Sequence, residues 1–171
     1  YIYSADDVRF IVQEAAGARL AVAAHALTER GARAAVEGGV ATLEHGFHMS
    51  DDLIRLAKEK GVWLCGTELS KEAWAVYGVS NIYLGVVDRL KRAYKLGLPM
   101  AFGSDLIVDV PGFTRGAAAL TITQSWVDAG IPAPDILKAM TSDAAKMLGL
   151  TGSRGVLRTG GAADLIAVAA N

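Results

Sequence analysis

Two short apolar runs, each ending in a histidine, decide the fold of this chain: Leu20-Ala-Val-Ala-Ala-His25 and Val40-Ala-Thr-Leu-Glu-His45. Two later runs have the same character, and they read Val62-Trp-Leu-Cys65 and Pro99-Met-Ala-Phe-Gly-Ser-Asp105. Because none of the four alternates cleanly between polar and apolar residues, each is typical of a strand buried on both faces. The sequence therefore predicts four strands of a parallel sheet.

Helical patterns fill the segments between these strands. Ser4 and Asp7 form a capping box, and apolar residues then recur at helical spacing as far as Gly17. Further helices are predicted over residues 27–38, 50–60, 81–96, 114–129 and 134–148. This alternation of strands and helices places the chain in the α/β class, with helices covering the sheet.

The end of the chain changes character after residue 150. Gly155-Val-Leu and Ala163-Asp-Leu-Ile-Ala-Val-Ala flank a glycine-rich turn, which predicts two short strands outside the parallel sheet. We therefore divide the chain into an α/β part, residues 1–150, and a small C-terminal β appendage, residues 151–171.

Composition excludes several classes of partner. The chain has 17 basic and 18 acidic residues, and this balance does not provide the basic face that nucleic acids require. The longest stretch without a charged residue, 73–87, is shorter than the ~18 residues of a membrane span, so no membrane partner is expected. Cys65 is the single cysteine, and an internal disulfide is therefore impossible. We expect a cytoplasmic protein.

Three of the four predicted strands lead into a residue that can bind a metal ion, namely His25, His45 and Asp105. The carboxyl ends of parallel strands meet at one edge of a sheet, so these side chains should converge there. Two imidazoles and a carboxylate suit zinc or a similar divalent ion. A single histidine at a strand end could equally be structural, but two of the chain's three histidines occupy equivalent positions.

Four further residues are candidates for contacting a substrate. His48 follows His45 in the next loop, where it could contact substrate or simply be exposed. The segment 67–80 carries Glu68, Trp74 and Tyr77, which could shape a substrate pocket, although the two aromatic residues could also pack in the core.

The motifs around these residues resemble a known family. Ala23-Ala-His25-Ala and Gly39-Val-Ala-Thr-Leu-Glu-His45-Gly46 resemble the amidohydrolase superfamily, in particular its imidazolonepropionase-like and Xaa-Pro dipeptidase-like members. Ala101-Phe-Gly-Ser-Asp105 resembles the last barrel strand of that family. Its C-terminal signature is matched by Thr141-Ser-Asp-Ala-Ala-Lys-Met-Leu-Gly-Leu150 and by Gly160-Gly-Ala-Ala-Asp-Leu-Ile166. The motifs occur in the family's order and span nearly the whole chain.

The resemblance implies a metal-dependent hydrolase built on a (β/α)8 TIM barrel. His25 would end the fifth strand and His45 the sixth, and both would bind the same ion. Asp105 would end the eighth strand, touch the metal and shuttle the proton. A metal ion lowers the pKa of water toward ~7, and a neighbouring carboxylate can then remove its proton.

Two elements of the family pattern are absent from the sequence. The first is the His-x-His of the opening barrel strand, and the second is the modified lysine of the fourth strand that bridges two ions. A barrel usually takes ~250 residues, and only four strands of eight are predicted here. We therefore expect the C-terminal half, strands 5 to 8, of a longer protein. Because a half barrel leaves sheet edges unpaired, we also expect a homo-oligomer or pairing with the missing N-terminal half.

These observations predict a metal-dependent hydrolase of amide (C–N) bonds in small peptides or cyclic amides. Zinc is the expected cofactor, as one or two ions in the full-length protein, and this part alone is expected to be inactive. One alternative is a metal-dependent deaminase or cyclic-imide hydrolase of the same superfamily. The other is an inactive unit that serves only in folding or oligomerisation.

Overall fold

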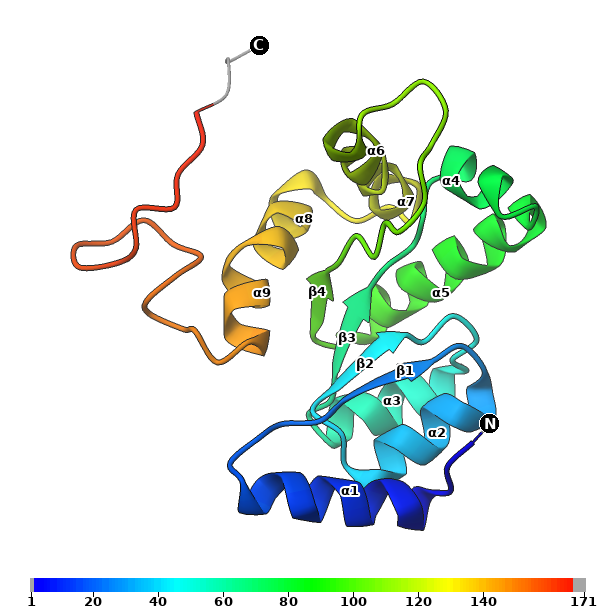
Figure 1. The fold of residues 1–171 in the computed structure, drawn as a ribbon, viewed down its shortest axis with the longest axis vertical. Helices are drawn as coiled ribbons and strands as arrows, with labels where there is room; N and C mark the ends of the chain where they lie inside the picture. Colours follow the sequence, from blue (N-terminus) through cyan, green and yellow to red (C-terminus); the bar gives the residue numbers. More distant parts are fainter. Residues whose placement is uncertain (1, 168–171) are drawn as a thin grey trace.

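The computed structural model describes residues 2–167 and contains the predicted four-stranded parallel sheet (Figure 1). Its strands are β1 (Ala23–Ala26), β2 (Thr42–His45), β3 (Trp63–Gly66) and β4 (Met100–Phe102), and they lie side by side in that order. Strands β1, β2 and β4 are shorter than the apolar runs that predicted them, whereas β3 has the predicted length and is shifted by one residue. Within the described chain, β1 and β4 each have a neighbouring strand on one side only.

The helices before and between the strands lie where the sequence predicted them. They are α1 (Ala5–Gly17), α2 (Glu29–Gly38), α3 (Asp51–Glu59) and α5 (Tyr83–Leu96). The looser segment after β3 also forms a short helix, α4 (Lys71–Val76), followed by a 3-10 turn, η1 (Ser80–Ile82). Both long helices predicted after β4 are divided, into α6 (Arg115–Thr121) with α7 (Thr123–Asp128), and α8 (Ala133–Met140) with α9 (Ser142–Met147).

Side-chain caps start five of these helices. Each capping oxygen accepts a hydrogen bond from the backbone N–H three residues later, which satisfies a donor that has no partner inside the helix. The capping residues are Ser4, Thr28, Ser50, Ser70 and Thr114. At Ser4 the reciprocal bond from Asp7 completes the predicted capping box.

The apolar core lies between the sheet and the helices that follow each strand. Leu43, Leu64 and Met100 stand opposite one another in the strand register and are all buried. Burying a side chain of this size stabilises a fold by about 1.5–3 kcal/mol. At one end of the sheet α1 packs closely on α2, because a Cβ at Gly38 would lie 2.4 Å from a methyl carbon of Val8.

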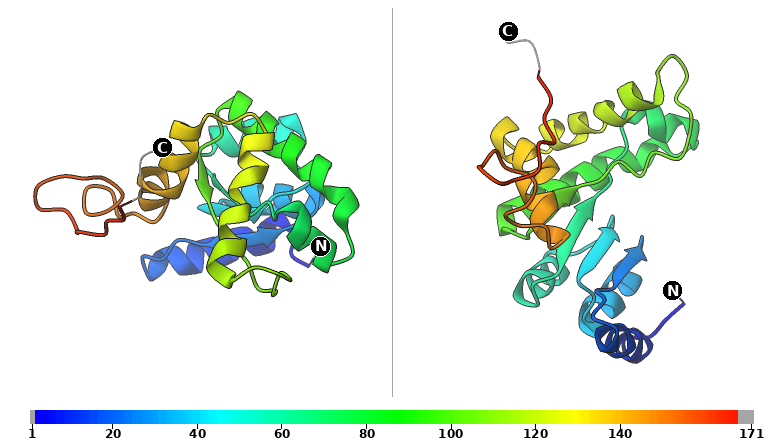
Figure 2. Two further views of the ribbon diagram at one scale, coloured as in Figure 1. Left: turned by 90° about the horizontal axis from the view of Figure 1, so that it is seen from above. Right: turned by 60° about the vertical axis from the view of Figure 1, so that its left-hand side comes forward.

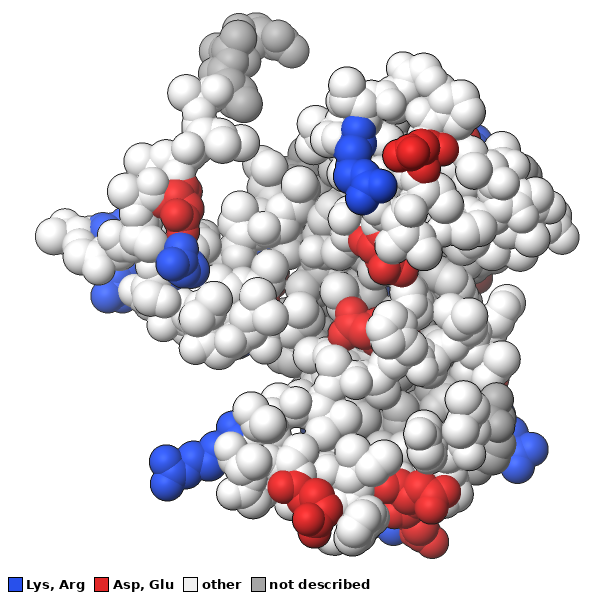
Figure 3. Space-filling view, in the orientation of Figure 1, with Lys and Arg blue, Asp and Glu red and all other residues white. Residues whose placement is uncertain are grey.

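The other face of the sheet is more open beside β1 and β2. Ala23 and His25 are exposed there, and Thr42 and Glu44 are half-buried. A cavity of about 530 Å³ separates these strands from the end of α9. In Figure 3 the surface is hollowed between the part that carries α9 and the part that carries α1, and most of this face carries no charged side chain.

The prediction of two strands in the C-terminal tail is wrong for the described residues. Between residues 151 and 167 the backbone makes one isolated bridge, from Thr151 to Arg154, and no strand. A strand needs a partner for its N–H and C=O groups, and this segment extends away from the helical body (Figure 2). Leu157 and Ile166 are accordingly exposed. The last residues of the predicted second strand lie outside the described chain.

No helix in residues 2–167 combines the length and the apolar character that crossing a bilayer requires.

Candidate active site

The structure brings the three predicted metal ligands together at the carboxyl edge of the sheet. The Nδ1 atom of His25 lies 2.8 Å from Nε2 of His45, and that Nε2 atom lies 3.9 Å from Oδ2 of Asp105. His25 belongs to β1, His45 ends β2, and Asp105 follows β4 by three residues. Segments that are far apart in the sequence therefore place their polar side chains around one point, as the parallel topology predicts.

Unusual backbone conformations help to create this arrangement. His25 stands opposite Glu44 in the register, so strict alternation along β2 would point His45 to the other face of the sheet. His45 instead has a φ of 71°, and its ring lies against that of His25. Asp105 also has a positive φ, of 42°. Such values are uncommon for residues other than glycine, and they occur preferentially at functional sites.

His45 is held on two sides inside this edge. Its Nδ1 atom lies 2.7 Å from the hydroxyl oxygen of Thr67, and its ring packs against Phe47 with ring centres 5.3 Å apart. Burial lowers the pKa of His45, and the neighbouring His25 lowers it further, whereas the carboxylate of Asp105 opposes the shift. The ring is therefore neutral near pH 7, which is the form that binds metal ions.

A cavity of about 210 Å³ opens beside these groups. One of its walls is aromatic, because Phe47 packs edge-on against Trp74, and Trp74 packs in turn against Tyr77. The complete lining consists of Leu27, His45, Phe47, Thr67, Leu69, Trp74, Tyr77 and Asp105. The cavity can hold an apolar or ring-shaped group next to the imidazole and the carboxylate.

Two of the three pocket candidates from segment 67–80 line this cavity, and the third does not. Trp74 and Tyr77 form part of its wall, whereas Glu68 is completely buried and makes an ion pair with Arg89 of α5. His48 is exposed and is not among the lining residues, so its contact with substrate stays a prediction.

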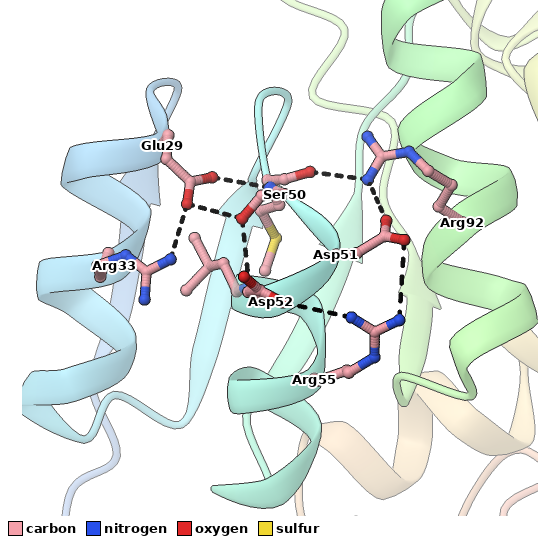
Figure 4. A network of polar contacts seen from close by, with 9 residues as sticks. Glu29, Arg33, Ser50, Asp51, Asp52, Arg55 and Arg92 are labelled. Atoms are coloured by element: carbon pink, nitrogen blue, oxygen red, sulfur yellow. Dashed lines mark hydrogen bonds and ion pairs between the residues drawn. The ribbon is translucent and has the colours of Figure 1, made fainter.

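A polar network fixes the loop that joins β2 to α3 (Figure 4). The carboxylate of Glu29, on α2, accepts hydrogen bonds from the backbone N–H and the hydroxyl of Ser50, at 2.8 and 2.9 Å. From the other side, Arg92 of α5 donates to the carbonyl oxygen of Met49 and to the carboxylate of Asp51. This loop carries Phe47, and the network therefore holds one wall of the cavity.

The donor set suits a divalent ion, but the two rings contact each other directly. At zinc–nitrogen distances of about 2.0–2.1 Å, two imidazole nitrogens on one tetrahedral ion lie about 3.3 Å apart. The observed 2.8 Å is a hydrogen-bond distance. Over residues 2–167, no three His, Cys, Asp or Glu side chains are already arranged to hold an ion. His25 is exposed and can move by the few tenths of an ångström required.

Cys65 lies close to this edge but is buried. Burial raises the pKa of its thiol far above the ordinary value, and a hydrogen bond with Glu44 adds to the shift. A protonated thiol is a poor nucleophile, and Cys65 therefore serves as a small buried side chain.

Comparison with known proteins agrees with this geometry. The model of the amidohydrolase family matches residues 1–171, which is the whole chain. The chain belongs to the amidohydrolase family. The resemblance drawn from the strand-end motifs is therefore confirmed, and the four parallel strands match part of the TIM barrel in amidohydrolase structures.

Individual amidohydrolases show how much of the fold is shared. Ochratoxinase from Aspergillus niger is 30% identical over 187 residues, which cover 99% of this chain and 36% of the relative. Among solved structures, a Xaa-Pro dipeptidase with bound methionine in its active site superposes with a TM-score of 0.83 at 26% identity, covering 99% of this chain and 44% of that one. A prolidase complexed with N-methylphosphonate-L-proline gives 0.74 at 29% identity, covering 95% and 41%. The chain thus spans about two fifths of the length of these amidohydrolases.

Proposed function

We propose that the chain is the C-terminal half, strands 5 to 8, of a metal-dependent amidohydrolase barrel that cleaves amide C–N bonds in small peptides or cyclic amides. The observation that carries the proposal is the meeting of His25, His45 and Asp105 at one sheet edge, beside a cavity with an aromatic wall. Active sites of TIM barrels lie at this edge, where the strands end and the loops begin.

His25 and His45 would hold the metal ion, with zinc expected. A bound divalent ion supplies two effects, acidification of water and polarisation of the substrate carbonyl. Asp105 is suited to handle the proton, because its carboxylate is about half exposed and its Oδ2 atom lies 3.9 Å from the His45 ring. This carboxylate takes a proton from the attacking water and later gives it to the leaving nitrogen.

The cavity favours a substrate with an apolar or cyclic group next to the scissile bond. Phe47, Trp74 and Tyr77 offer flat apolar surfaces, and Asp105 marks the reactive end. The names of the relatives support the same class, since they include a Xaa-Pro dipeptidase and a prolidase. His48 would contact the polar part of the substrate from the exposed loop after β2.

The test replaces Asp105 by Asn in the complete protein that contains this chain. We expect kcat to fall by about 10²–10⁴-fold, the contribution typical of a general base, while the bound metal stays within the wild-type range. Asp109→Asn is the matched control, because Asp109 follows in the same loop and its side chain is 98% exposed. Turnover can be measured as amine release from Xaa-Pro dipeptides and N-acyl amino acids. An unchanged kcat in Asp105→Asn would remove this carboxylate from the reaction.

A further inference from the structure

The four residues 67–70, here called the β3 loop, are unusually buried for a connecting segment. Thr67, Glu68, Leu69 and Ser70 are all 6% exposed or less. Loops normally run over the surface, because a buried loop must find partners inside the protein for its polar groups. The partners of the β3 loop therefore indicate what it is built to hold.

Three contacts anchor the β3 loop to the surrounding helices. The Glu68 carboxylate pairs with the Arg89 guanidinium on α5, and both side chains are completely buried. The hydroxyl of Ser125, on α7, donates to the carbonyl oxygen of Glu68 at 2.8 Å. Ser70 caps α4, which carries Trp74 of the cavity wall. The loop is therefore fixed to three helices at once.

The ion pair leaves its two members few alternative partners. Within the described chain, Oε2 of Glu68 and the Nε and Nη1 atoms of Arg89 are buried without a hydrogen-bond partner. Because both side chains are 0% exposed, a shift of the loop would separate two charges in a place that solvent does not reach. The backbone next to Glu68 is accordingly held in one position.

Thr67 adjoins this anchor, and its hydroxyl contacts the candidate active site. Its Oγ1 atom lies 2.7 Å from Nδ1 of His45. A half-turn of the ring would replace Nδ1 by a carbon atom at that place and would break the hydrogen bond. The bond therefore selects the ring orientation in which Nε2 points toward His25 and Asp105.

We propose that Thr67 is a positioning residue for His45, and that the buried Glu68–Arg89 pair holds Thr67 in place. Its hydroxyl fixes the orientation of the His45 ring. In the tautomer that suits a metal ligand, a protonated Nδ1 donates to this hydroxyl, and the ring presents an unprotonated Nε2 to the centre of the site. This role for Thr67 rests on the proposed function in one respect, namely that His45 is a metal ligand. The contact between Thr67 and His45 is a feature of the structure and does not depend on that function.

The test uses the chain labelled with ¹⁵N in its histidines and freed of metal by a chelator, at a pH where all imidazoles are neutral. With three histidines, the spectrum has at most three imidazole systems. In the wild type, His45 should give two well-separated nitrogen signals, one protonated and one not. In Thr67→Val, which removes the hydroxyl and nearly keeps the shape, that separation should be lost as tautomers exchange. Exposed His48 should not change.

Two further variants separate positioning from a general effect on folding. Thr67→Ser keeps the hydroxyl and should keep the wild-type His45 signals. Thr123→Val makes the same chemical change at a hydroxyl that donates to the backbone carbonyl oxygen of Leu120, three residues earlier. This variant should leave the His45 signals unaffected. Unchanged His45 signals in Thr67→Val would overturn the proposal. Should Thr67→Val fail to fold, signals in Thr67→Ser that differ from wild type would overturn it equally.

This spectrum does not depend on turnover. If Thr67→Val loses the two separate His45 signals while Asp105→Asn leaves kcat unchanged, the positioning role of Thr67 is supported and the proposed role of Asp105 in hydrolysis is refuted. Unchanged His45 signals in Thr67→Val together with a lowered kcat in Asp105→Asn would refute the positioning role of Thr67 and leave the hydrolase proposal intact.

Discussion

Replacing Arg89 by Met should destabilise the chain more than any surface ion pair can. Arg89 and Glu68 are both 0% exposed, and among residues 2–167 Oε2 of Glu68 already lacks a hydrogen-bond partner. Removing the guanidinium leaves a buried carboxylate with no compensating charge, which costs about 3–5 kcal/mol. That is a large part of the roughly 5–15 kcal/mol that holds a domain folded.

Urea denaturation followed by tryptophan fluorescence measures this loss. All variants are compared at one chain concentration, because the predicted assembly would also contribute to stability. Arg55→Met is the matched control. Arg55 pairs with Asp51 and Asp52 at the surface, where its side chain is 57% exposed, and such pairs contribute about 0–1 kcal/mol. The double variant Glu68→Met, Arg89→Met should recover most of the loss, since neither charge remains. A loss in Arg89→Met no larger than in Arg55→Met would refute the anchoring role of the pair.

Three other predictions concern the rest of the chain. Burial and the hydrogen bond to Asp128 raise the pKa of Tyr83 to about 12, so its phenolate absorbance should appear near pH 12 in the folded chain. Because the folded state favours the neutral phenol, Tyr83 contributes to the free energy of unfolding below pH 10, and this contribution is lost between pH 10 and 12. A titration midpoint of Tyr83 near pH 10 in the folded protein would contradict the raised pKa. Cys65 should resist iodoacetamide at pH 8 until urea unfolds the chain, and rapid labelling without urea would contradict its burial. Light scattering after size-exclusion chromatography should show a particle heavier than 17.9 kDa, because exposing hundreds of Å² of open barrel interior costs several kcal/mol at roughly 25 cal/mol per Å². A cooperatively folding monomer would contradict the half barrel.

Much of the sheet and the meeting of the site residues could be predicted from the sequence. Apolar runs that end in His25, His45 and Asp105 identify buried parallel strands, and parallel strands place their ends at one edge by geometry alone. The helix starts were equally predictable, since Ser4 and Ser50 are capping residues that satisfy backbone donors locally. The apolar runs and the helix caps depend on interactions within a few residues, and short sequence patterns therefore predict them directly.

Features that depend on distant packing were not predictable. The positive φ of His45, which turns its ring toward His25, could not be predicted from the sequence, because residues other than glycine rarely adopt this conformation. Glu68 and Arg89 are ordinary surface residue types, and only the fold shows that they are buried together. Thr67 was missed for the same reason, because its partner lies 22 residues away. The tail has strand-forming residues, yet its described part lies away from the sheet (Figure 2) and pairs with neither edge strand, β1 or β4.

The most direct test of the proposed metal site is anomalous X-ray diffraction at the absorption edge of zinc, from crystals of the complete protein grown with zinc. An anomalous peak is predicted within about 2.0–2.1 Å of one imidazole nitrogen of each of His25 and His45, with the Asp105 carboxylate beside it. A fully occupied zinc that is bound elsewhere, with His25 and His45 still hydrogen-bonded to each other, would contradict the metal-dependent hydrolase.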